Sequence, residues 1–571
     1  MIAEQTAGLD ALLFVGLPLI WRGKLYNVAA VLNGGKVLGL VPKTYLPAYN
    51  EFYEARHFTP GMAEPVEVMV GGHAVPMGTK LLFACEGVPE LVLAAEICED
   101  LWTPDPPSIR HARNGATVIV NLSASNETTG KDVYRRELVY GQSARLLCGY
   151  IYASAGDGES TQDVVYSGHN LIAENGRLLA ESRRFVNGMA CTELDVHRIA
   201  AERRRMTTFT TLDEGYRVIP FAVKETRTAL SRFIDPMPFV PGKKEERDKR
   251  CDEILSIQAL GLKKRLAHTN CKTAVVGISG GLDSTLALLV TVRAFDLLGI
   301  EHGCIKAVTM PGFGTTDRTY DNAVRLIRSL GADFTEVDIR EAVSIHFRDI
   351  GQDASVHDVT YENGQARERT QILMDIANKE SGMVIGTGDL SELALGWATY
   401  NGDHMSMYAV NASVPKTLVR HLVRYYADTC GDAELARVLL DVLDTPVSPE
   451  LLPPEDGKIS QKTEDIVGPY ELHDFFLYHM LRLTEPPHKI YRLAKHAFAG
   501  TYDDETIFKW LEVFYRRFFS QQFKRSCLPD GPKVGSVAVS PRGDLRMPSD
   551  ACARIWLDDL EQIYSHRNGG I

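Results

Sequence analysis

Short apolar runs, each closed by turn-forming residues, dominate residues 1–235. They include 11–19 (ALLFVGLPL), 25–33 (LYNVAAVLN), 36–43 (KVLGLVPK), 91–100 (LVLAAEICED), 116–124 (ATVIVNLSA) and 148–156 (CGYIYASAG). Apolar runs of this length between turn residues predict buried β-strands. A helix-like segment, 132–149, lies between two of them. The pattern predicts a mixed α/β sandwich for this region.

A different pattern begins near residue 246, where helix-like and strand-like segments alternate. A helix over 246–269 precedes a buried strand at 273–279 and an amphipathic helix at 283–299. A strand at 304–310, a helix at 317–332 and a strand at 333–339 follow. This alternation predicts a doubly wound parallel sheet that binds ligands at the carboxyl ends of its strands. Beyond residue 430 the chain is mostly helical in pattern.

Residues 231–250 separate the two patterns. They read SRFIDPMPFVPGKKEERDKR, in which three prolines and a glycine are followed by dense charge. Such composition is typical of a linker that leads into a helix. We therefore predict a first domain at 1–235, a linker at 236–245 and a second domain at 246–571.

Composition narrows the classes of function. The hydrophobic share of 45% and charged share of 24% exclude a disordered or collagen-like chain. The net charge of −12 disfavours a nucleic-acid partner, because such proteins neutralise many phosphates with Lys and Arg. The ten cysteines form no CxxC pair, which disfavours zinc-ribbon and thioredoxin-like sites and indicates a reduced, cytoplasmic protein. No apolar run reaches the ~18–20 residues that span a bilayer, so we expect no membrane partner.

A glycine-rich loop, GISGGLDS, lies between the predicted strand at 273–279 and the helix that follows. Adjacent glycines allow close backbone approach, and the free N–H groups of a helix N-terminus suit phosphate. The loop lacks the Gly-Lys-Ser/Thr of a Walker A motif, and a strand-to-helix turn without a ligand is the alternative. It resembles the SGGxDS loop of ATP pyrophosphatases, which hold the leaving pyrophosphate. The implied ATP-binding residues are Gly277, Ile278, Ser279, Gly280, Gly281, Leu282, Asp283 and Ser284.

A second cluster of polar residues follows the apolar segment MVIG. Residues 386–403 read GTGDLSELALGWATYNGD, and 411–417 read NASVPKT. Glu392 is placed to join Asp283 around Mg²⁺, which would neutralise triphosphate charge. Lys416 is placed to reach an ATP phosphate.

These segments, together with 273–288 (TAVVGISGGLDSTLAL) and 362–378 (ENGQARERTQILMDIAN), resemble the NAD⁺ synthetases. The tail segments 522–534 and 540–556 resemble the glutamine-dependent form. The resemblance implies that deamido-NAD⁺ attacks the α phosphate of ATP and that ammonia then displaces AMP. It implies ATP contacts at Thr387, Lys416 and Ser448. The implied deamido-NAD⁺ contacts are Asn363, Glu392, Trp397, Ala398, Thr399, Tyr400 and Lys524.

Cys98 directly follows a predicted buried strand. A cysteine there is by itself more often part of a core. However, 41–61 (VPKTYLPAYNEFYEARHFTPG), 91–102 and 120–131 together resemble a nitrilase-type glutaminase domain. The resemblance implies that Cys98 attacks the glutamine amide and that Lys43 stabilises the thiolate and the oxyanion. The implied glutamine-binding residues are Tyr49, Ser125 and Lys131.

The sequence departs from the family at the general-base glutamate. In the family it lies in a Pro-Glu-Leu-type segment well upstream of GLPL (16–19 here), whereas the only upstream glutamate is Glu4. Either the chain is a fragment or carries a misplaced start, or the glutaminase is truncated and inactive. The otherwise intact glutaminase segments favour the first explanation. Glu51 is our hypothesis for a support of Lys43.

Four functions therefore compete. The first is glutamine-dependent amidation of deamido-NAD⁺, with ATP as co-substrate and Mg²⁺. The second is an ammonia-dependent synthetase whose first region is structural. The third, another ligase such as a GMP synthetase, is disfavoured because those enzymes use a Cys-His-Glu glutaminase. The fourth is a non-catalytic nucleotide-binding scaffold. The resemblance also implies a homo-oligomer and an ammonia tunnel between the domains.

Overall fold

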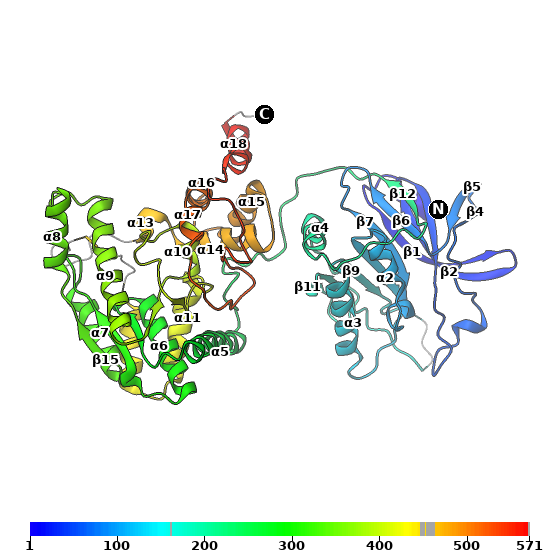
Figure 1. Cartoon of the computed structure of the whole chain (residues 1–571). Helices are drawn as coiled ribbons and strands as arrows, with labels where there is room; N and C mark the ends of the chain where they lie inside the picture. Colours follow the sequence, from blue (N-terminus) through cyan, green and yellow to red (C-terminus); the bar gives the residue numbers. More distant parts are fainter. Residues whose placement is uncertain (160–162, 446–450, 453–462, 569–571) are drawn as a thin grey trace. The chain divides into compact units, whose positions relative to one another are not determined.

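The computed structural model describes residues 1–159, 163–445, 451–452 and 463–568. The chain divides into two compact units, Met1–Phe233 and Ile234–Ile571 (Figure 1). Each unit has its own sheets and core.

The first unit contains mainly strands. Its elements are α1 (Ile2–Gln5), β1 (Leu13–Trp21), β2 (Lys24–Asn33), β3 (Lys36–Pro42), η1 (Glu54–Arg56), β4 (Val66–Val70), β5 (His73–Met77), β6 (Leu81–Cys85), β7 (Val92–Ile97), η2 (Cys98–Leu101), α2 (Pro107–Arg113), β8 (Val118–Ser123), α3 (Lys131–Leu146), β9 (Gly149–Ser154), β10 (Leu171–Glu174), β11 (Arg177–Glu181), α4 (Val196–Arg205) and β12 (Arg217–Phe221).

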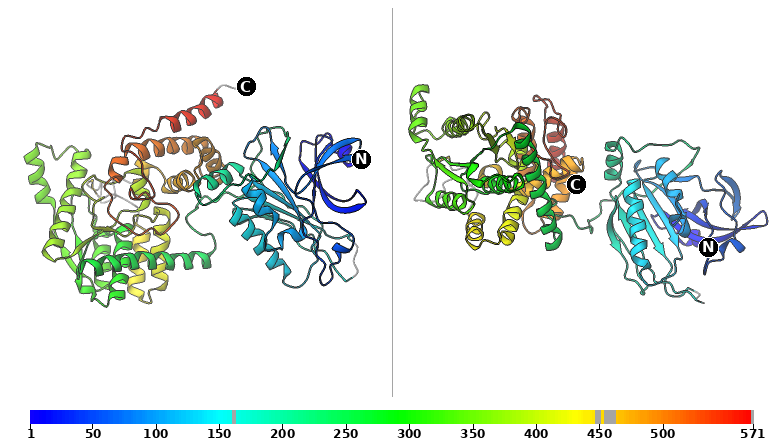
Figure 2. Two further views of the ribbon diagram at one scale, coloured as in Figure 1. Left: turned by 45° about the vertical axis from the view of Figure 1, so that its right-hand side comes forward. Right: turned by 60° about the horizontal axis from the view of Figure 1, so that its bottom comes forward.

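Two sheets stack in this unit. Among the described residues, one sheet has the order β1-β2-β3-β5-β4 and the other β11-β10-β9-β8-β7-β6-β12. Val31 and Val41 of the first sheet pack against Phe83 and Ile97 of the second. Helices α2 and α3 cover the outer face of the second sheet (Figures 1 and 2). The predicted α/β sandwich is confirmed.

The second unit alternates strands and helices and ends in a helical tail. Its elements are α5 (Lys244–Thr269), β13 (Ala274–Gly277), α6 (Leu282–Leu298), η3 (His302–Cys304), β14 (Ile305–Thr309), α7 (Asp317–Ser329), β15 (Asp333–Glu336), α8 (Arg340–Ile350), α9 (Val359–Lys379), β16 (Met383–Gly386), α10 (Leu390–Leu395), β17 (Tyr408–Ala409), α11 (Lys416–Thr429), α12 (Ala433–Leu443), α13 (Thr463–Val467), α14 (Tyr470–Leu477), η4 (Tyr478–Arg482), α15 (Pro487–Ala497), α16 (Asp504–Ser520), α17 (Gln522–Arg525) and α18 (Arg554–Asn568).

The sheet of this unit has the order β15-β14-β13-β16-β17, and the paired strands are parallel. Successive residues of β13 enter different cores, because side chains alternate across a strand. Val276 packs with α5, α6, α11 and α12, whereas Val275 packs with α8 and α9. The predicted doubly wound parallel sheet is therefore confirmed. Its buried strands place the loops after β13, β14 and β16 at one edge.

No helix among the described residues is long and apolar enough to cross a membrane.

Candidate active sites

The glycine-rich loop of the second unit joins β13 to α6. Gly280 has a φ of +87°, and a Cβ on it would lie 2.1 Å from the carbonyl oxygen of Thr319, so only glycine fits. The Gly281 N–H donates to Ser279 Oγ at 3.2 Å, and Ser284 Oγ donates to the Gly281 carbonyl at 3.1 Å. Among the described residues no side-chain hydrogen bond caps α6, so its first N–H groups are available to a ligand. This geometry suits a phosphate group.

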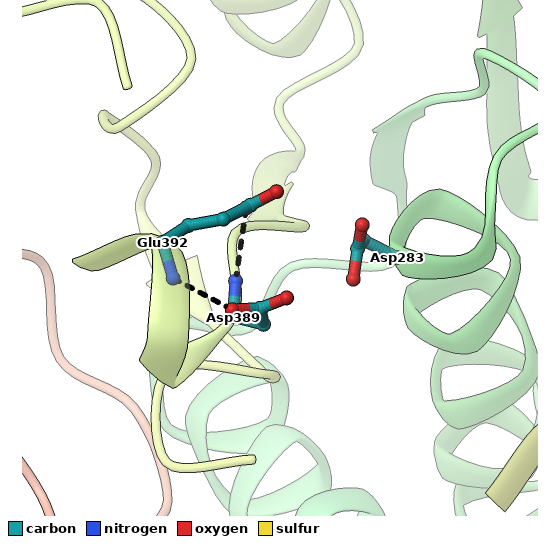
Figure 3. A group of neighbouring side chains, drawn as sticks. All are labelled: Asp283, Asp389 and Glu392. Carbon is teal, nitrogen blue, oxygen red and sulfur yellow. Dashed lines mark hydrogen bonds between the residues drawn. The ribbon is translucent and has the colours of Figure 1, made fainter. Parts of the chain in front are cut away.

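Three carboxylates and a lysine meet beside this loop. Ligand atoms of Asp283, Asp389 and Glu392 all lie within 4.8 Å of one another (Figure 3). Lys416 Nζ lies 2.7 Å from Asp283, 2.7 Å from Asp389 and 2.9 Å from Glu392. It also lies 5.3 Å from the centre of the Tyr470 ring. Mg²⁺ is usually held by one or two carboxylates together with water and phosphate oxygens, so two of these side chains beside a phosphate loop would fit that ion.

Local structure explains why two of these carboxylates converge. Asp389 caps α10 by accepting the Glu392 N–H at 2.9 Å, and Glu392 accepts the Asp389 N–H at 3.4 Å. This reciprocal cap fixes both side chains at the end of β16. Burial raises the pKa of Glu392 to about 7 and that of Asp389 well above its usual range, because charge is disfavoured away from water. Burial also opposes the charge of Lys416, but the three carboxylates outweigh it and raise the pKa of Lys416.

A cavity of about 710 Å³ opens in front of the loop. It is lined by most of the residues that the sequence indicated for ATP and deamido-NAD⁺. These are Gly277, Ile278, Ser279, Gly281, Leu282, Asp283, Ser284, Thr387, Asn363, Glu392, Trp397, Ala398, Thr399 and Lys524. Gly280 packs against α7 and Lys416 lies buried behind its carboxylates, while Tyr400 is half-exposed next to the cavity segment. Ser448 lies outside the described residues.

The segment after α10 is held in place by Lys524. Its Nζ donates to the carbonyl oxygens of Gly396 at 2.8 Å and Ala398 at 2.6 Å. Thr399 Oγ1 donates to Asn363 Oδ1 at 2.7 Å. Residues from α9, α17 and the loop after α10 are thereby brought together on one wall of the cavity.

The sequence did not predict several residues that line the cavity of the second unit. Thr309 and Met310 end the neighbouring strand β14, and the rule that parallel strands present their carboxyl ends at one edge could have indicated them. Arg369 and Arg517 also line the cavity. They carried no sequence signal, because arginines on amphipathic helices are usually solvated.

Cys98 lies at a sharp turn in the first unit. It begins η2 directly after β7 and has a φ of +47°, which is uncommon for a residue with a side chain. Its N–H donates to Asn121 Oδ1 at 3.2 Å. The Asn121 amide donates to the Tyr150 hydroxyl at 3.2 Å, and that hydroxyl donates to the buried Glu96. This buried network fixes the backbone of Cys98.

A cavity of about 780 Å³ surrounds Cys98. The residues that the sequence indicated for glutamine hydrolysis all line it: Lys43, Tyr49, Cys98, Ser125 and Lys131. Tyr49 donates to Glu99 Oε1 at 2.7 Å. Burial, followed by that carboxylate, raises the pKa of Tyr49 to about 12.

The carboxylate that supports Lys43 is Glu54. Lys43, only 3% exposed, forms a close ion pair with it, and Asn27 donates to the other carboxylate oxygen at 2.8 Å. Glu51 instead accepts from Asn126 at 2.7 Å, so the hypothesis that Glu51 supports Lys43 is wrong. The difference arises because η1 carries residue 54, rather than residue 51, under the lysine. Glu4 lies at the surface, 3.1 Å from the amino terminus.

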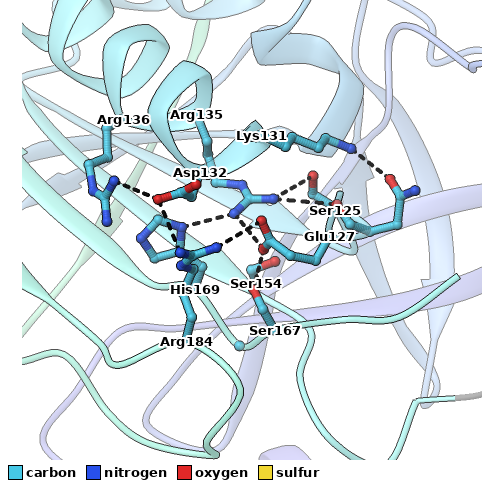
Figure 4. A network of polar contacts seen from close by, with 12 residues as sticks. Ser125, Glu127, Lys131, Asp132, Arg135, Arg136, Ser154, Ser167, His169 and Arg184 are labelled. Atoms are coloured by element: carbon cyan, nitrogen blue, oxygen red, sulfur yellow. Dashed lines mark hydrogen bonds and ion pairs between the residues drawn. The ribbon is translucent and has the colours of Figure 1, made fainter. Parts of the chain in front are cut away.

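A buried arginine supports the side of this cavity where the sequence predicted glutamine contacts. Arg135 donates to Glu127 at 3.0 Å, to His169 Nδ1 at 2.8 Å and to Ser125 Oγ at 3.3 Å (Figure 4). Lys131, one turn earlier on α3, donates to Asn126 Oδ1 at 2.6 Å. The network fixes the turn that presents Ser125, so the two predicted glutamine contacts have a common support.

Two protein families match the chain. A carbon-nitrogen hydrolase model matches residues 2–204, and an NAD synthase model matches residues 254–496. Each match coincides with one cavity: Cys98 in the first, and the glycine-rich loop in the second. The chain therefore belongs to the class of ligases that carry an amide-hydrolysing region of their own.

Whole-length relatives narrow the class. The chain is 44% identical to the glutamine-dependent NAD(+) synthetase of Mycobacterium bovis over 98% of this chain and 88% of the relative. It is 29% identical to that of Aquifex aeolicus, over 96% and 87%. A crystal structure of a glutamine-dependent NAD(+) synthetase from Cytophaga hutchinsonii matches at 22% identity and a TM-score of 0.46, over 98% and 88%. This chain belongs to the glutamine-dependent NAD⁺ synthetases.

Proposed function

We propose that the chain amidates deamido-NAD⁺ to NAD⁺ with ATP, using ammonia released from L-glutamine at Cys98. The observation that carries the proposal is the pair of cavities, one around a cysteine and a lysine and one around a pyrophosphate-type loop. The prediction from sequence, a glutamine-dependent enzyme, agrees with the family to which the chain belongs.

In the first cavity, the Cys98 sulfur attacks the amide carbon of glutamine, and Lys43 stabilises the negative charge that forms on oxygen. Ammonia leaves and a thioester remains, which water hydrolyses to glutamate. Ser125, Lys131 and Tyr49 hold the substrate, with Lys131 facing its carboxylate. The ion pair with Glu54 keeps the ammonium group of Lys43 oriented towards the sulfur.

In the second cavity, a carboxylate oxygen of the nicotinate attacks the α phosphorus of ATP. Pyrophosphate leaves into the loop at 277–284, where backbone N–H groups and the hydroxyls of Ser279 and Ser284 bind it. Ammonia then attacks the acyl carbon, and AMP leaves. Asn363, Trp397, Thr399, Tyr400 and Lys524 position the deamido-NAD⁺.

Mg²⁺ would be held by Asp283 and Glu392 and would screen the charge of the triphosphate from that of the second anionic substrate. Asp389 lies within the same group of ligand atoms. Thr387 contacts an ATP phosphate in this proposal, and Lys416 holds the three carboxylates beside the loop. We also propose, from the resemblance alone, a homo-oligomer in the cytoplasm.

The test compares nitrogen donors. Purified chain is given deamido-NAD⁺, ATP and magnesium with either glutamine or an ammonium salt, and NAD⁺ and AMP are measured. We expect product with both donors, and Cys98→Ala should abolish product only with glutamine. Product with ammonium alone in the unmodified chain would instead identify an ammonia-dependent synthetase. Absence of AMP with either donor would refute the proposal.

A further inference from the structure

A cysteine and a histidine form a hydrogen-bonded pair beside the second cavity. Cys527 is exposed and follows α17. Its Sγ lies 3.4 Å from Nε2 of His404 and 3.4 Å from the carbonyl oxygen of Lys524. His404 itself lines the cavity. The two residues are far apart in sequence and meet only in the fold.

The histidine is held in the orientation of a general base. His404 is 5% exposed, and its Nδ1 lies 2.9 Å from the carbonyl oxygen of Thr399. A carbonyl oxygen only accepts, so Nδ1 carries the ring proton and the lone pair of Nε2 points at the thiol. The ring of Tyr400 stacks on it at 5.2 Å. Burial lowers the pKa of His404, so the ring is neutral and Nε2 carries no proton.

A nucleophile, a base within hydrogen-bond reach and a third group that orients the base are the signature of an activated side chain. We propose that Cys527 is a reversible thiol-modification site that takes low-molecular-weight disulfides and controls the deamido-NAD⁺ cavity. The thiol proton passes to Nε2 of His404 as the sulfur attacks one sulfur of the disulfide. The S–S bond breaks, one half leaves as a thiolate, and a mixed disulfide remains. A second thiol reverses the exchange.

The same contacts transmit the modification to the cavity. Cys527 lies on the turn that carries Lys524, whose ammonium group holds Gly396 and Ala398. His404 holds the Thr399 carbonyl. A substituent on the sulfur displaces the imidazole and loosens this wall, so the KM for deamido-NAD⁺ rises by about tenfold. This second part rests on the proposed function; the reactivity of the thiol does not.

The first arm of the test measures reactivity on the full chain. Iodoacetamide is added, and labelling of each cysteine peptide is followed by mass spectrometry. Cys191 and Cys552 are matched controls, because they are also exposed and hydrogen-bond no imidazole among the described residues. We expect Cys527 to label at least tenfold faster than either control, and His404→Gln to remove that advantage without changing Cys191. Equal rates, or a rate at Cys527 that His404→Gln leaves unchanged, would overturn the proposal.

The second arm measures control of the cavity. The chain is treated with oxidised glutathione and assayed with ammonium as nitrogen donor, so that Cys98 is not required. We expect the KM for deamido-NAD⁺ to rise and a reducing thiol to restore it, while Cys527→Ser keeps its activity throughout. A mixed disulfide at Cys527 with an unchanged KM would refute control of the cavity. Lack of NAD⁺ formation in the untreated chain would refute the proposed function and leave the labelling contrast standing.

Discussion

Each unit buries a lysine at its cavity, and the two lysines are paired in different ways. Lys43 is 3% exposed and faces a single carboxylate, Glu54. Lys416 is 4% exposed and faces three, from Asp283, Asp389 and Glu392. The first pair balances its charge, whereas the second group would carry a surplus of negative charge if all three carboxylates were ionised.

This difference in pairing indicates whether the charged groups at each cavity need a further ion. A balanced buried pair needs no further ion, and removing either partner leaves the other charge unpaired. Burial raises the pKa of Glu392 to about 7; the charge of Lys416 opposes this shift and repulsion from Asp283 adds to it. Such a group is stabilised by a divalent cation. Lys43 thus has its counter-charge within the fold, whereas the Lys416 group would gain a further partner from a bound cation.

Removing the balanced lysine should have the largest effect. Lys43→Met takes away the charge that the proposed mechanism places at the oxyanion and leaves the partly buried Glu54 without its ion pair. We expect glutamine-dependent NAD⁺ formation to fall by about 10³-fold or more, while formation from ammonium is retained. Glutamate release and NAD⁺ formation are measured separately. Lys80→Met is the matched control, since Lys80 pairs with Glu64 at 2.6 Å at the surface. Equal losses with both nitrogen donors would show that Lys43 acts through folding.

Removing a carboxylate of the surplus group should be nearly as severe and should not depend on the nitrogen donor. Asp283→Asn deletes one candidate ligand of Mg²⁺ beside the phosphate loop. We expect AMP release to fall by about 10²–10³-fold with glutamine and with ammonium, comparable to losing a major electrostatic group. The half-saturating magnesium concentration should rise. Asp321→Asn, on the exposed face of α7, should change neither value.

The ion pair between Lys43 and Glu54 can also be weakened by changing the glutamate. Glu54→Gln keeps the shape but removes the charge, so Lys43 loses its orientation. We expect the kcat of glutamate release to fall by about 10–100-fold, comparable to losing a positioning group. Glu51→Gln is the matched change three residues earlier, on a carboxylate that contacts Asn126 instead. It should act mainly on the KM for glutamine. A larger loss of kcat for Glu51→Gln would reverse the assignment.

The sequence predicted the features of the fold that depend on local residue patterns. Strand–helix alternation predicted the parallel sheet, and the order Gly-Gly-x-Asp-Ser predicted a loop in which Gly280 has a positive φ. It did not predict β4 and β5, because their hairpin exposes residues such as Met69 and lacks a continuous apolar run. Nor did it predict β12, which pairs with β6 far earlier in the chain.

Pairings between side chains were the least predictable part of the sites. The choice between Glu51 and Glu54 depends on the short helix η1, whose register has no periodic signal. The contact between His404 and Cys527 depends on how α17 packs beside the loop after α10. Both depend on tertiary geometry: the sequence named Lys43 but not its partner, and it named neither His404 nor Cys527.

The smallest expected effect concerns a buried carboxylate two residues after Cys98. Asp100 accepts the N–H groups of Tyr45 at 2.8 Å and Ile97 at 2.9 Å, and burial raises its pKa to about 7. The folded state therefore holds the proton of Asp100 more tightly than the unfolded state does. The resulting contribution to the free energy of unfolding is complete below about pH 4 and is lost as the pH rises through about 7.

Asp100→Asn should remove this dependence on pH. The free energy of unfolding of the unmodified chain, relative to the variant, should fall by at most about 4 kcal/mol between pH 4 and pH 7. Thermal midpoints of both proteins, measured across that range, give the difference. The Asp100→Asn variant is less stable at every pH if its NH₂ group faces the backbone N–H donors. The test is therefore how the stability difference changes with pH, and not its size at any one pH. If the difference in the free energy of unfolding between the two proteins stays constant with pH, Asp100 remains ionised in the folded state. Its backbone N–H donors would then stabilise the charge, as Glu54 stabilises that of Lys43.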